Sequence, residues 1–323
     1  MTISRSTFLI AGASYGASLA KGARAHAAAL APLTAAYVPS TLFAPLFVAY
    51  DRGFLTSAGF AGNLQPIVAG QDAIALLAQG QLDLVAGGIS AAFFNAIERG
   101  LEVRLVGSTG YQPQHGHPSA LMVRSDLYES GLRDTRGLKG KKVAWVGGAG
   151  ATAAYYVARI LRDAGLSLSD IEMVNLANPD QGPALERKAI DAVFSNAPFT
   201  IAFEQQHLAR MIAGPPRGIS GTGIFFGPTL LKAPPRARAV VGALRRAAAI
   251  VSGKGYYAPE NIATYGKYTK QSAAVLDNLD RYDFAPDLHI DEATVLDMQS
   301  EFLKQKVLAY PNPLPAQRLF AHF

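Results

Sequence analysis

The chain has 323 residues, of which half are hydrophobic and 17% are charged, so it is long enough for two domains and too apolar for general disorder. Its formal net charge of +6 falls to about +3 when Arg5, Lys21 and Arg24 are set aside, because 27 basic and 24 acidic residues remain. The remaining basic residues are scattered, which argues against a nucleic-acid partner. The absence of cysteine excludes disulfides, thiolate metal ligands and cysteine nucleophiles, and it suits an oxidising compartment.

The first residues have the pattern of an export signal. Arg5 precedes an apolar, small-residue run from Phe8 to Ala20, and Ala25-His26-Ala27 offers the A-x-A pattern of signal peptidase cleavage. We predict a signal peptide over residues 1–27, removed after Ala27. Residues 4–9 are similar to a twin-arginine signal with Ser6 at the place of the second arginine, so Sec and variant Tat export both stay open. A helical or disordered extension is the alternative.

From residue 33 to residue 124, apolar runs that fit strands alternate with helical patterns. Strands are predicted at 33–38, 64–68, 82–86, 103–107 and 120–123, and helices at 44–55, 73–79 and from residue 90 onward. Residues 111–118 form a polar loop that is rich in histidine, glutamine and proline. This alternation is typical of a mainly parallel sheet with helical crossovers.

The alternation is repeated from residue 142 onward. Strands are predicted at 142–146, 171–176, 192–194 and 223–226, and helices at 151–163, 182–188, 198–206, 237–252, 260–268 and 291–304. We therefore expect two α/β lobes, the first built from residues 28–124 plus 224–323 and the second from residues 125–223. Two segments cross between such lobes, which predicts a hinge and a cleft.

Two similar stretches suggest the walls of that cleft. In residues 82–94 an apolar strand leads through Gly87 and Gly88 to Ser90 at the start of a helix. In residues 143–154 a strand leads through a glycine-rich turn to Thr152 at the next helix start. Such turns leave backbone N–H groups facing outward at the carboxyl end of a parallel sheet, where acceptor groups bind.

Five segments, in order, resemble a known family. They are residues 44–55 with Gly53-Phe54-Leu55, residues 76–83, the Leu-Lys-Gly-Lys-Lys-Val-Ala run at 138–144, residues 164–171 with Ala-Gly-Leu, and residues 189–192. Together they are similar to the periplasmic substrate-binding proteins of ABC importers for nitrate, sulfonates, taurine and thiamine-pyrimidine precursors. The resemblance covers nearly all of the chain after residue 27.

The resemblance implies a type II periplasmic binding protein, in which two lobes close over one ligand without catalysis. It implies a monomer that needs no cofactor and delivers a small molecule to an ABC permease in the inner membrane. Exposed helix N-termini favour an anion such as a sulfonate or an aromatic or aliphatic carboxylate. A neutral thiamine-precursor pyrimidine or similar heterocycle, a sensor subunit, and an enzyme on the same scaffold are the alternatives.

In such a fold, loops at the carboxyl ends of strands and helix N-termini of both lobes contact the ligand. The residues at such positions, which we predict to contact the ligand, are Ser40, Thr41, Gly70, Gln71, Gly88, Ser90, Tyr111, Gly150, Thr152, Asn178, Asn196 and Phe199. For Ser90 and Thr152 the alternative is simple helix capping, and for Tyr111 it is packing over the hinge. Some relatives have a glutamate at the position of Asn196 that binds an amine, so a cationic ligand is not favoured here.

Two further patterns are typical of a metal site and of a dinucleotide site, and both are incomplete. His115-Gly116-His117 could share a metal ion, but no carboxylate or further histidine stands at ligand spacing, so we expect no metal site. Residues 148–153 fit a G-x-G-x-x-A dinucleotide pattern, but the acid that would hold a ribose is missing at the end of the next strand. We therefore expect no bound cofactor.

Overall fold

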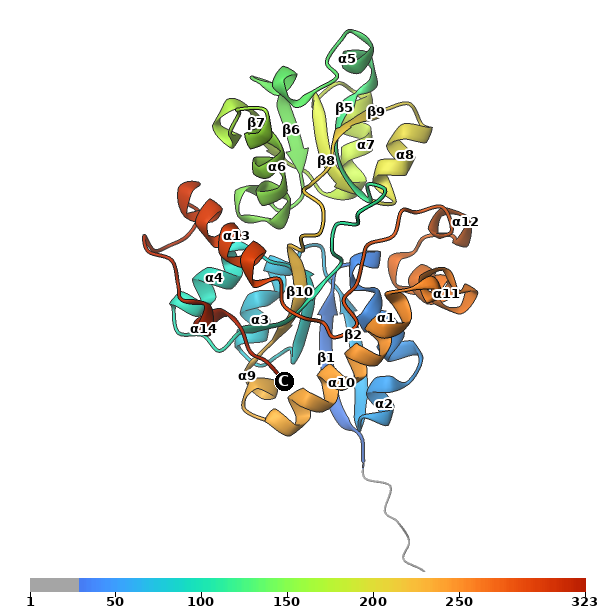
Figure 1. The fold of residues 1–323 in the computed structure, drawn as a ribbon, viewed down its shortest axis with the longest axis vertical. Coiled ribbons are helices and arrows are strands. Elements are labelled where there is room, and N and C mark those ends of the chain that lie inside the picture. Colours follow the sequence, from blue (N-terminus) through green and yellow to red (C-terminus); the bar gives the residue numbers. More distant parts are fainter. Residues whose placement is uncertain (1–28) are drawn as a thin grey trace, which may run out of the picture.

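The structure is a computed structural model, and it describes residues 29–323; the predicted signal peptide lies outside the described residues. Two lobes, each built around a five-stranded sheet, are stacked along the long axis of the molecule (Figure 1). Among residues 29–323, no helix combines the length and the apolar character that a membrane crossing needs.

The first lobe contains the sheet with strand order β2-β1-β3-β10-β4. Its strands are β1 (Ala31–Tyr37), β2 (Phe60–Pro66), β3 (Leu84–Gly88), β4 (Arg104–Thr109) and β10 (Thr222–Phe226). Strands β1, β2 and β3 are parallel, and β10 runs antiparallel to both of its neighbours, β3 and β4. The sheet is therefore mainly parallel, with one strand reversed.

The second lobe repeats this plan with the strand order β7-β6-β8-β5-β9. Its strands are β5 (Ser119–Arg124), β6 (Lys142–Trp145), β7 (Glu172–Asn175), β8 (Ala192–Asn196) and β9 (Ala209–Ala213). Here β5 is the reversed strand. In each lobe the reversed strand directly follows a hinge crossing, because a chain that enters a lobe from the cleft must run against strands whose carboxyl ends face the cleft.

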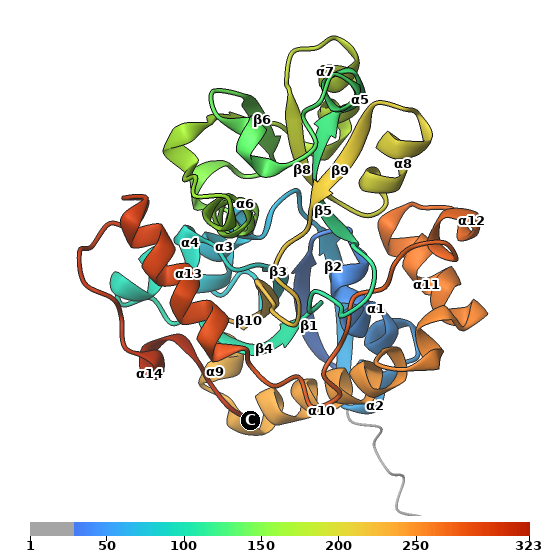
Figure 2. The same cartoon turned by 45° about the horizontal axis from the view of Figure 1, so that its top comes forward.

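Helices cover both faces of the first sheet (Figures 1 and 2). One face carries α1 (Ala44–Asp51), α2 (Phe54–Ser57), α9 (Pro228–Leu231), α10 (Pro234–Val251), α11 (Pro259–Thr269) and α12 (Ala273–Leu276). The other face carries α3 (Ile74–Ala78), α4 (Ala91–Glu98), α13 (Glu292–Lys304) and α14 (Ala316–Leu319). The helix predicted over residues 44–55 is interrupted at Gly53, whose φ of 67° ends α1 and starts α2.

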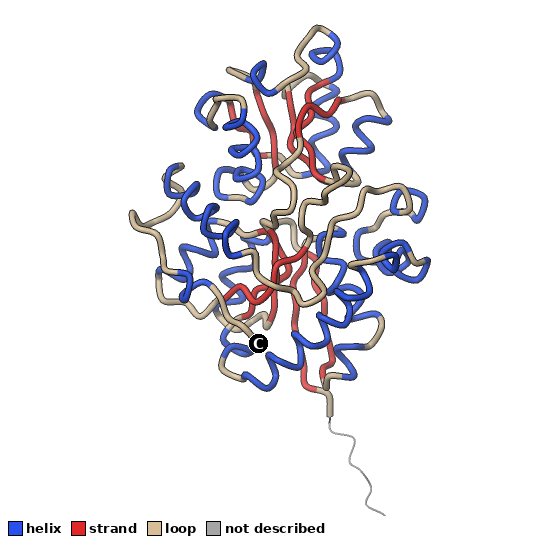
Figure 3. The backbone as a smooth tube through the Cα atoms, viewed as in Figure 1, coloured by secondary structure: helices blue, strands red, loops and turns tan. Residues whose placement is uncertain are grey.

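The second sheet is also covered on both faces. Helix α6 (Thr152–Asp163) packs against Val143 and Trp145, whereas α7 (Asn178–Glu186) and α8 (Phe199–Gln205) pack against Ala144. Successive residues of a strand point to opposite faces, so the apolar run of β6 serves both helical layers. Helix α5 (Ser125–Glu129) lies beside β5 and β9 at the far end of the lobe (Figure 3).

Short 3-10 helices complete the described elements. They lie at Thr41–Phe43, Gly70–Ala73, Thr135–Leu138, Gly148–Gly150, Leu168–Asp170 and Lys254–Tyr257. Two of them, Gly70–Ala73 and Gly148–Gly150, are the small-residue turns at the cleft edges of the two lobes.

The two crossings are residues 110–118 and 214–221, and they pair with each other. The backbone N–H of Gln112 donates to the carbonyl of Ile219 at 2.9 Å, and the N–H of Gly218 donates to the carbonyl of Gln112 at 2.8 Å.

The structure differs from the expected lobe boundaries at both crossings. Residues 119–124, expected in the first lobe, form β5 of the second sheet, and residues 222–223, expected in the second lobe, belong to β10 of the first. The turn-forming residues after position 125, which suggested the crossing, instead build α5 and the 3-10 helix Thr135–Leu138.

Candidate ligand-binding site

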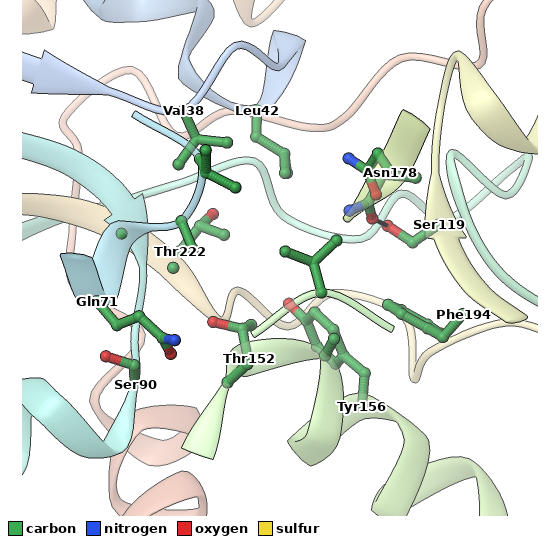
Figure 4. A pocket seen from close by; sticks show the side chains of 18 of the residues that line it. Val38, Leu42, Gln71, Ser90, Ser119, Thr152, Tyr156, Asn178, Phe194 and Thr222 are labelled. Atoms are coloured by element: carbon green, nitrogen blue, oxygen red, sulfur yellow. Dashed lines mark hydrogen bonds between the residues drawn. The ribbon is translucent and has the colours of Figure 1, made fainter. Parts of the chain in front are cut away.

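A cavity of about 130 Å³ lies between the lobes where the cleft edges of both sheets meet (Figure 4). The first lobe and the hinge contribute Val38, Leu42, Phe43, Val68, Ala69, Gly70, Gln71, Gly88, Ser90, Gln112 and Thr222. The second lobe contributes Ser119, Val146, Ala151, Thr152, Ala153, Tyr156, Asn178, Phe194 and Asn196. None of these side chains carries a charge, so the cavity combines apolar walls with neutral polar groups.

Seven of the residues predicted for the site meet in this cavity. They are Gly70, Gln71, Gly88, Ser90, Thr152, Asn178 and Asn196. They come from both lobes and lie at strand ends or helix starts, which is the basis on which the sequence nominated them.

Three predicted residues of the first lobe do not line the cavity, and each has a structural role. The Ser40 hydroxyl accepts the N–H of Leu42 at 3.3 Å and so caps the 3-10 helix that follows. Thr41 is buried in the lobe, and its hydroxyl has no hydrogen-bond partner among the described residues. The Tyr111 hydroxyl donates to the carbonyl of His289 at 2.8 Å, so this ring packs over the hinge, as the alternative interpretation held.

Two predicted residues of the second lobe also lie outside the cavity. A Cβ built at Gly150 would lie 2.9 Å from the Cβ of Ala91, so this glycine permits close contact with the start of α4 in the other lobe. Phe199 packs against Phe203 with the ring centroids 6.4 Å apart, on the face of the sheet that α8 covers. Its place at a helix start suggested the cleft, but the apolar ring is used inside the lobe.

The helices that start at the two half-sites have no side-chain caps. Ser90 has the extended backbone of an N-cap residue, yet its hydroxyl bonds to no N–H of α4, and it has no partner among the described residues although Ser90 is only 2% exposed. At α6 the N-cap residue is Ala151, which has no side-chain acceptor. The N–H groups of Phe93 and Ala154 donate to the carbonyls of Ser90 and Ala151, and no side chain accepts from the other first N–H groups of the two helices. The capping interpretation is wrong for Ser90 and Thr152.

Thr152 joins the lobes instead. Its hydroxyl donates to the carbonyl of Ile89 at 2.8 Å and lies 3.3 Å from the carbonyl of Gly221. A Cβ built at Gly88 would overlap the Thr152 hydroxyl, so only glycine allows this approach. Gln71 makes a second contact between the lobes, because its Nε2 donates to the carbonyl of Gly147 at 3.3 Å. The lobes are thus closed over the cavity.

A chain of hydrogen bonds orients the amide of Asn196. Gln112 Nε2 donates to the Ser119 hydroxyl at 3.2 Å, and that hydroxyl donates to Asn196 Oδ1 at 2.7 Å. The Tyr282 hydroxyl lies 3.1 Å from the same oxygen of Ser119. Because Oδ1 of Asn196 accepts, its Nδ2 group is left to donate into the cavity.

Tyr156 supplies another donor from α6. Its hydroxyl accepts the N–H of Gly221 at 2.7 Å, and none of the described residues accepts its proton. Burial raises the pKa of Tyr156 to about 12, so the phenol stays protonated at neutral pH. The sequence carried a signal for it, because Tyr156 follows Thr152 by four residues and i, i+4 residues share a helix face. Gln112 and Ser119 carried none, since they stand in and just after an irregular crossing.

The structure places His115 and His117 in the first crossing. Within residues 29–323, no three histidine, aspartate or glutamate side chains gather as metal ligands would. His117 Nε2 lies 3.1 Å from Arg217 Nη2, which ties its ring to the hinge instead.

Comparisons with known proteins agree with this architecture. The model of the family described as NMT1/THI5 like matches residues 40–254, more than half of the chain. A search of the curated proteins gives no match.

Among solved structures, the alkanesulfonate-binding protein SsuA from Xanthomonas axonopodis pv. citri, bound to MOPS, superposes with a TM-score of 0.72 at 23% identity, covering 92% of this chain and 100% of that one. The periplasmic aliphatic sulphonate binding protein SsuA from Escherichia coli gives 0.70 at 20%, covering 90% and 92%. The periplasmic nitrate-binding protein NrtA from Synechocystis PCC 6803 gives 0.69 at 11%, covering 87% and 83%. At these identities the likeness establishes the periplasmic binding protein fold.

Proposed function

Because the chain belongs to the NMT1/THI5-like family, we propose that it is the solute-binding component of an ABC importer and captures a small organic anion between its lobes. A sulfonate or a carboxylate is the class of ligand that the site supports best. The protein meets this ligand in the periplasm, closes by a hinge motion and presents the closed form to a permease in the inner membrane.

The observation that carries the proposal is the surplus of hydrogen-bond donors around the cavity. The first N–H groups of α4 and α6 have no side-chain caps, and the Ser90 hydroxyl is buried without a partner. Tyr156 O–H and Asn196 Nδ2 add two further donors. The start of α6 lines the cavity through Ala151, Thr152 and Ala153, and the start of α4 reaches it through Ser90. A positive helix end favours an anionic acceptor, and a sulfonate offers three acceptor oxygens in one group.

The cavity also limits the size of the ligand. Its volume of about 130 Å³ is close to that of an engineered cavity of roughly 150 Å³ that binds benzene. Phe43, Val68 and Phe194 provide apolar surface for a short alkyl or single-ring body. Short alkanesulfonates and single-ring carboxylates therefore fit the closed form without further opening.

The absence of charge favours a second candidate. No lysine or arginine lines the cavity, so an anion would be balanced by helix ends and neutral donors alone. A neutral heterocycle such as a thiamine-precursor pyrimidine would use the amides of Gln71, Asn178 and Asn196 and need no balancing charge.

An enzyme or a sensor on the same scaffold receives less support. The cavity is lined by no histidine, carboxylate or lysine, so no lining group could act as a general base near neutral pH. A sensor would use the same closure, and it differs from a transporter only in the partner that recognises the closed form.

The test is a thermal-shift and calorimetric comparison of matched pairs on the chain from Ala28, unfolded and refolded to remove any carried ligand. Methanesulfonate is compared with its neutral analogue dimethyl sulfone, and benzoate with benzamide. A ligand at 100 times its dissociation constant stabilises the folded protein by about 2.7 kcal/mol. We expect the anion of at least one pair to bind and its neutral partner not to. Equal binding within a pair, or binding of pyrimidines alone, would overturn the anion proposal.

A further inference from the structure

Helix α13 lies between the two lobes on the side away from α11 and α12 (Figures 1 and 2), and it contacts both α4 and α6. The sequence expected this segment to be an ordinary helix of the first lobe. Its position makes it a second place where the lobes meet, separate from the cavity.

The first lobe and the hinge hold α13 in place. Phe302 packs against Phe94 of α4, with the ring centroids 6.1 Å apart. At the start of the helix, Asp291 accepts the N–H of Thr294 at 3.2 Å as the cap and the N–H of Ser220 in the second crossing at 2.9 Å. These contacts, together with the contacts of the following helix α14 to α4 and β4, attach α13 to the first lobe and the hinge.

One carboxylate on α13 binds the second lobe. Asp297 accepts the Tyr155 hydroxyl at 2.8 Å and Arg159 Nη1 at 2.5 Å, and Arg162 Nη2 lies 4.0 Å away. Arg159 is ordered further by the Tyr155 hydroxyl, which lies 3.1 Å from its Nη1. Burial alone would raise the pKa of Asp297, but the hydrogen bonds from Tyr155 and Arg159 outweigh it and lower that pKa. The carboxylate is therefore ionised and its bonds are charge-assisted.

This contact is linked to the ligand cavity through a single helix. The residues of α6 that line the cavity are Thr152, Ala153 and Tyr156, while Tyr155 and Arg159 of the same helix bind Asp297. Consecutive residues of a helix point about 100° apart. Tyr156 can therefore line the cavity while its neighbour Tyr155 contacts Asp297. When the lobes separate, the cavity and the contact to Asp297 must open together.

We propose that Asp297 is a positioning residue for ligand capture, which holds the lobes closed through Tyr155 and Arg159 at a contact that the ligand does not touch. It biases the ligand-free protein toward the closed form and slows release of a bound ligand. The effect on release rests on the proposed function, whereas the effect on closure does not.

The chain offers a matched control inside one lobe. Asp51 of α1 accepts the Tyr268 hydroxyl at 2.6 Å and Lys267 Nζ at 2.7 Å, both from α11 of the same lobe. Asp297→Asn and Asp51→Asn thus remove the same chemistry, a carboxylate that binds a tyrosine and a cation. Only the first change affects a contact between lobes.

Closure is measured in the ligand-free protein by electron-spin distance measurements. The chain has no cysteine, so Ser57→Cys on α2 and Glu129→Cys on α5, both exposed, place one spin label on each lobe. We expect Asp297→Asn to raise the ratio of open to closed molecules about threefold or more, as suits a partly exposed ion pair, and Asp51→Asn to leave it unchanged. One molar salt should shift the unmutated protein in the same direction and the Asp297→Asn protein much less.

A double-mutant cycle with Arg159→Gln separates the contact from general loss of stability. If the two residues act through each other, the double variant opens no further than either single variant. A distance distribution of Asp297→Asn identical to that of the unmutated protein would overturn the proposal. So would an equal shift in Asp51→Asn. Because no ligand is present, either result leaves the proposed function to its own test.

Discussion

Gly88 shows how one missing side chain permits the closed state. The residue ends β3 in the first lobe, and the Thr152 hydroxyl of the second lobe occupies the space where a Cβ would stand. The same hydroxyl donates to the carbonyl of Ile89, so the contact is a hydrogen bond made possible by a glycine. The backbone of Gly88 is ordinary for any residue, and the constraint is therefore space alone.

We expect Gly88→Ala to fold normally and to bind the ligand at least about tenfold more weakly. The added methyl group has room while the lobes are apart, but in the closed form it displaces Thr152 and loses a hydrogen bond between lobes, which is worth roughly 1 kcal/mol or more with the strain added. Isothermal titration calorimetry with the tightest ligand of the matched pairs measures the loss.

Gly242→Ala in α10 is the control, since nothing lies within 4 Å of a Cβ there. It should gain a few tenths of a kcal/mol to about 1 kcal/mol of stability and leave affinity unchanged. A Gly88→Ala protein with full affinity would show that ligand binding does not need the closed contact at Thr152.

Among single residues of the site, the sequence identified those that stand at the ends of predicted strands or at the starts of predicted helices. Gly88, Ser90 and Thr152 stand at the end of an apolar strand or at the helix start that follows it, so their place at the cleft could be inferred. Tyr111 could not be placed, because its hydroxyl bonds to His289, which is 178 residues away in the chain. Ser119 gave no signal either, although it lines the cavity, since it stands just after an irregular crossing.

Helix α6 is the element that begins at the cavity and lines it with Thr152, Ala153 and Tyr156. Its N-cap residue, Ala151, has extended backbone angles that suit a capping side chain, yet it has none to offer. A side-chain cap at this position normally stabilises a helix, so the uncapped N–H groups lower the stability of the ligand-free protein. A ligand that accepts from these groups would restore the missing hydrogen bonds. Stability and binding should therefore respond in different directions to changes at this residue.

We expect Ala151→Ser to stabilise the ligand-free protein by about 0.5–2 kcal/mol, because its hydroxyl caps α6. Ala151→Asp caps the same groups but brings a negative charge into an uncharged cavity, so it should weaken binding of a sulfonate or carboxylate by more than about tenfold. Chemical unfolding measures the first effect and calorimetry the second.

The control is Ala258→Ser at the N-cap of α11, which also lacks a side-chain cap and does not line the cavity. It should stabilise the protein to a similar degree without any change in affinity. Anion affinity that survives Ala151→Asp would mean that the ligand does not use the N-terminus of α6.

Most elements of the fold follow from hydrophobic periodicity, and the exceptions have identifiable causes. The break between α1 and α2 depends on the left-handed backbone of Gly53, which a helical pattern does not reveal. Strand β9 was not expected, because Ala209–Ala213 includes Arg210 and only one of its residues is fully buried. Strand β5 was expected as a strand but in the wrong lobe, since periodicity does not say which sheet a strand joins.

At the scale of the whole molecule, the hinge is braced by side chains as well as by its paired backbones. Arg217 in the second crossing donates to the carbonyls of Pro113 and Gln114 in the first, at 3.0 and 2.5 Å. Its Nη2 also lies 3.1 Å from His117 Nε2. A guanidinium can only donate, so His117 must accept through an unprotonated Nε2, and the ring is neutral in this brace.

Two lobes with a hinge could be inferred from the sequence because each lobe repeats the same alternation of strands and helices. The contacts that set the closed geometry could not. Arg217 and His117 are 100 residues apart, and Asp297 and Tyr155 are 142 residues apart. A single sequence carries no signal for such pairs, since each of these residues alone is of a type that is common on a solvated surface.

The neutral His117 predicts a pH dependence of folding with a definite sign. Burial, together with the charge of Arg217, lowers the pKa of His117 below its usual 6.5, against the opposing effect of Asp280. The unfolded chain therefore binds the proton more readily than the folded one, and stability from this residue is complete above pH 6.5. It should be lost as the pH falls from 6.5 through the lower folded-state pKa.

Chemical unfolding at a series of pH values, comparing the unmutated protein with His117→Gln, tests this expectation. Glutamine can accept from Arg217 through Oε1 without titrating, so the free energy of unfolding of the variant should fall less below pH 6.5. The difference between the two profiles cancels the contributions of all other titrating groups.

His115→Gln is the matched control, because that side chain is exposed and bonds to none of the described residues, and its profile should follow that of the unmutated protein. If His117→Gln kept the full slope, or His115→Gln lost it, the hinge brace would not depend on a neutral His117. Loss of the slope at His117 alone would mean that acidification loosens the crossing on which closure of the lobes depends.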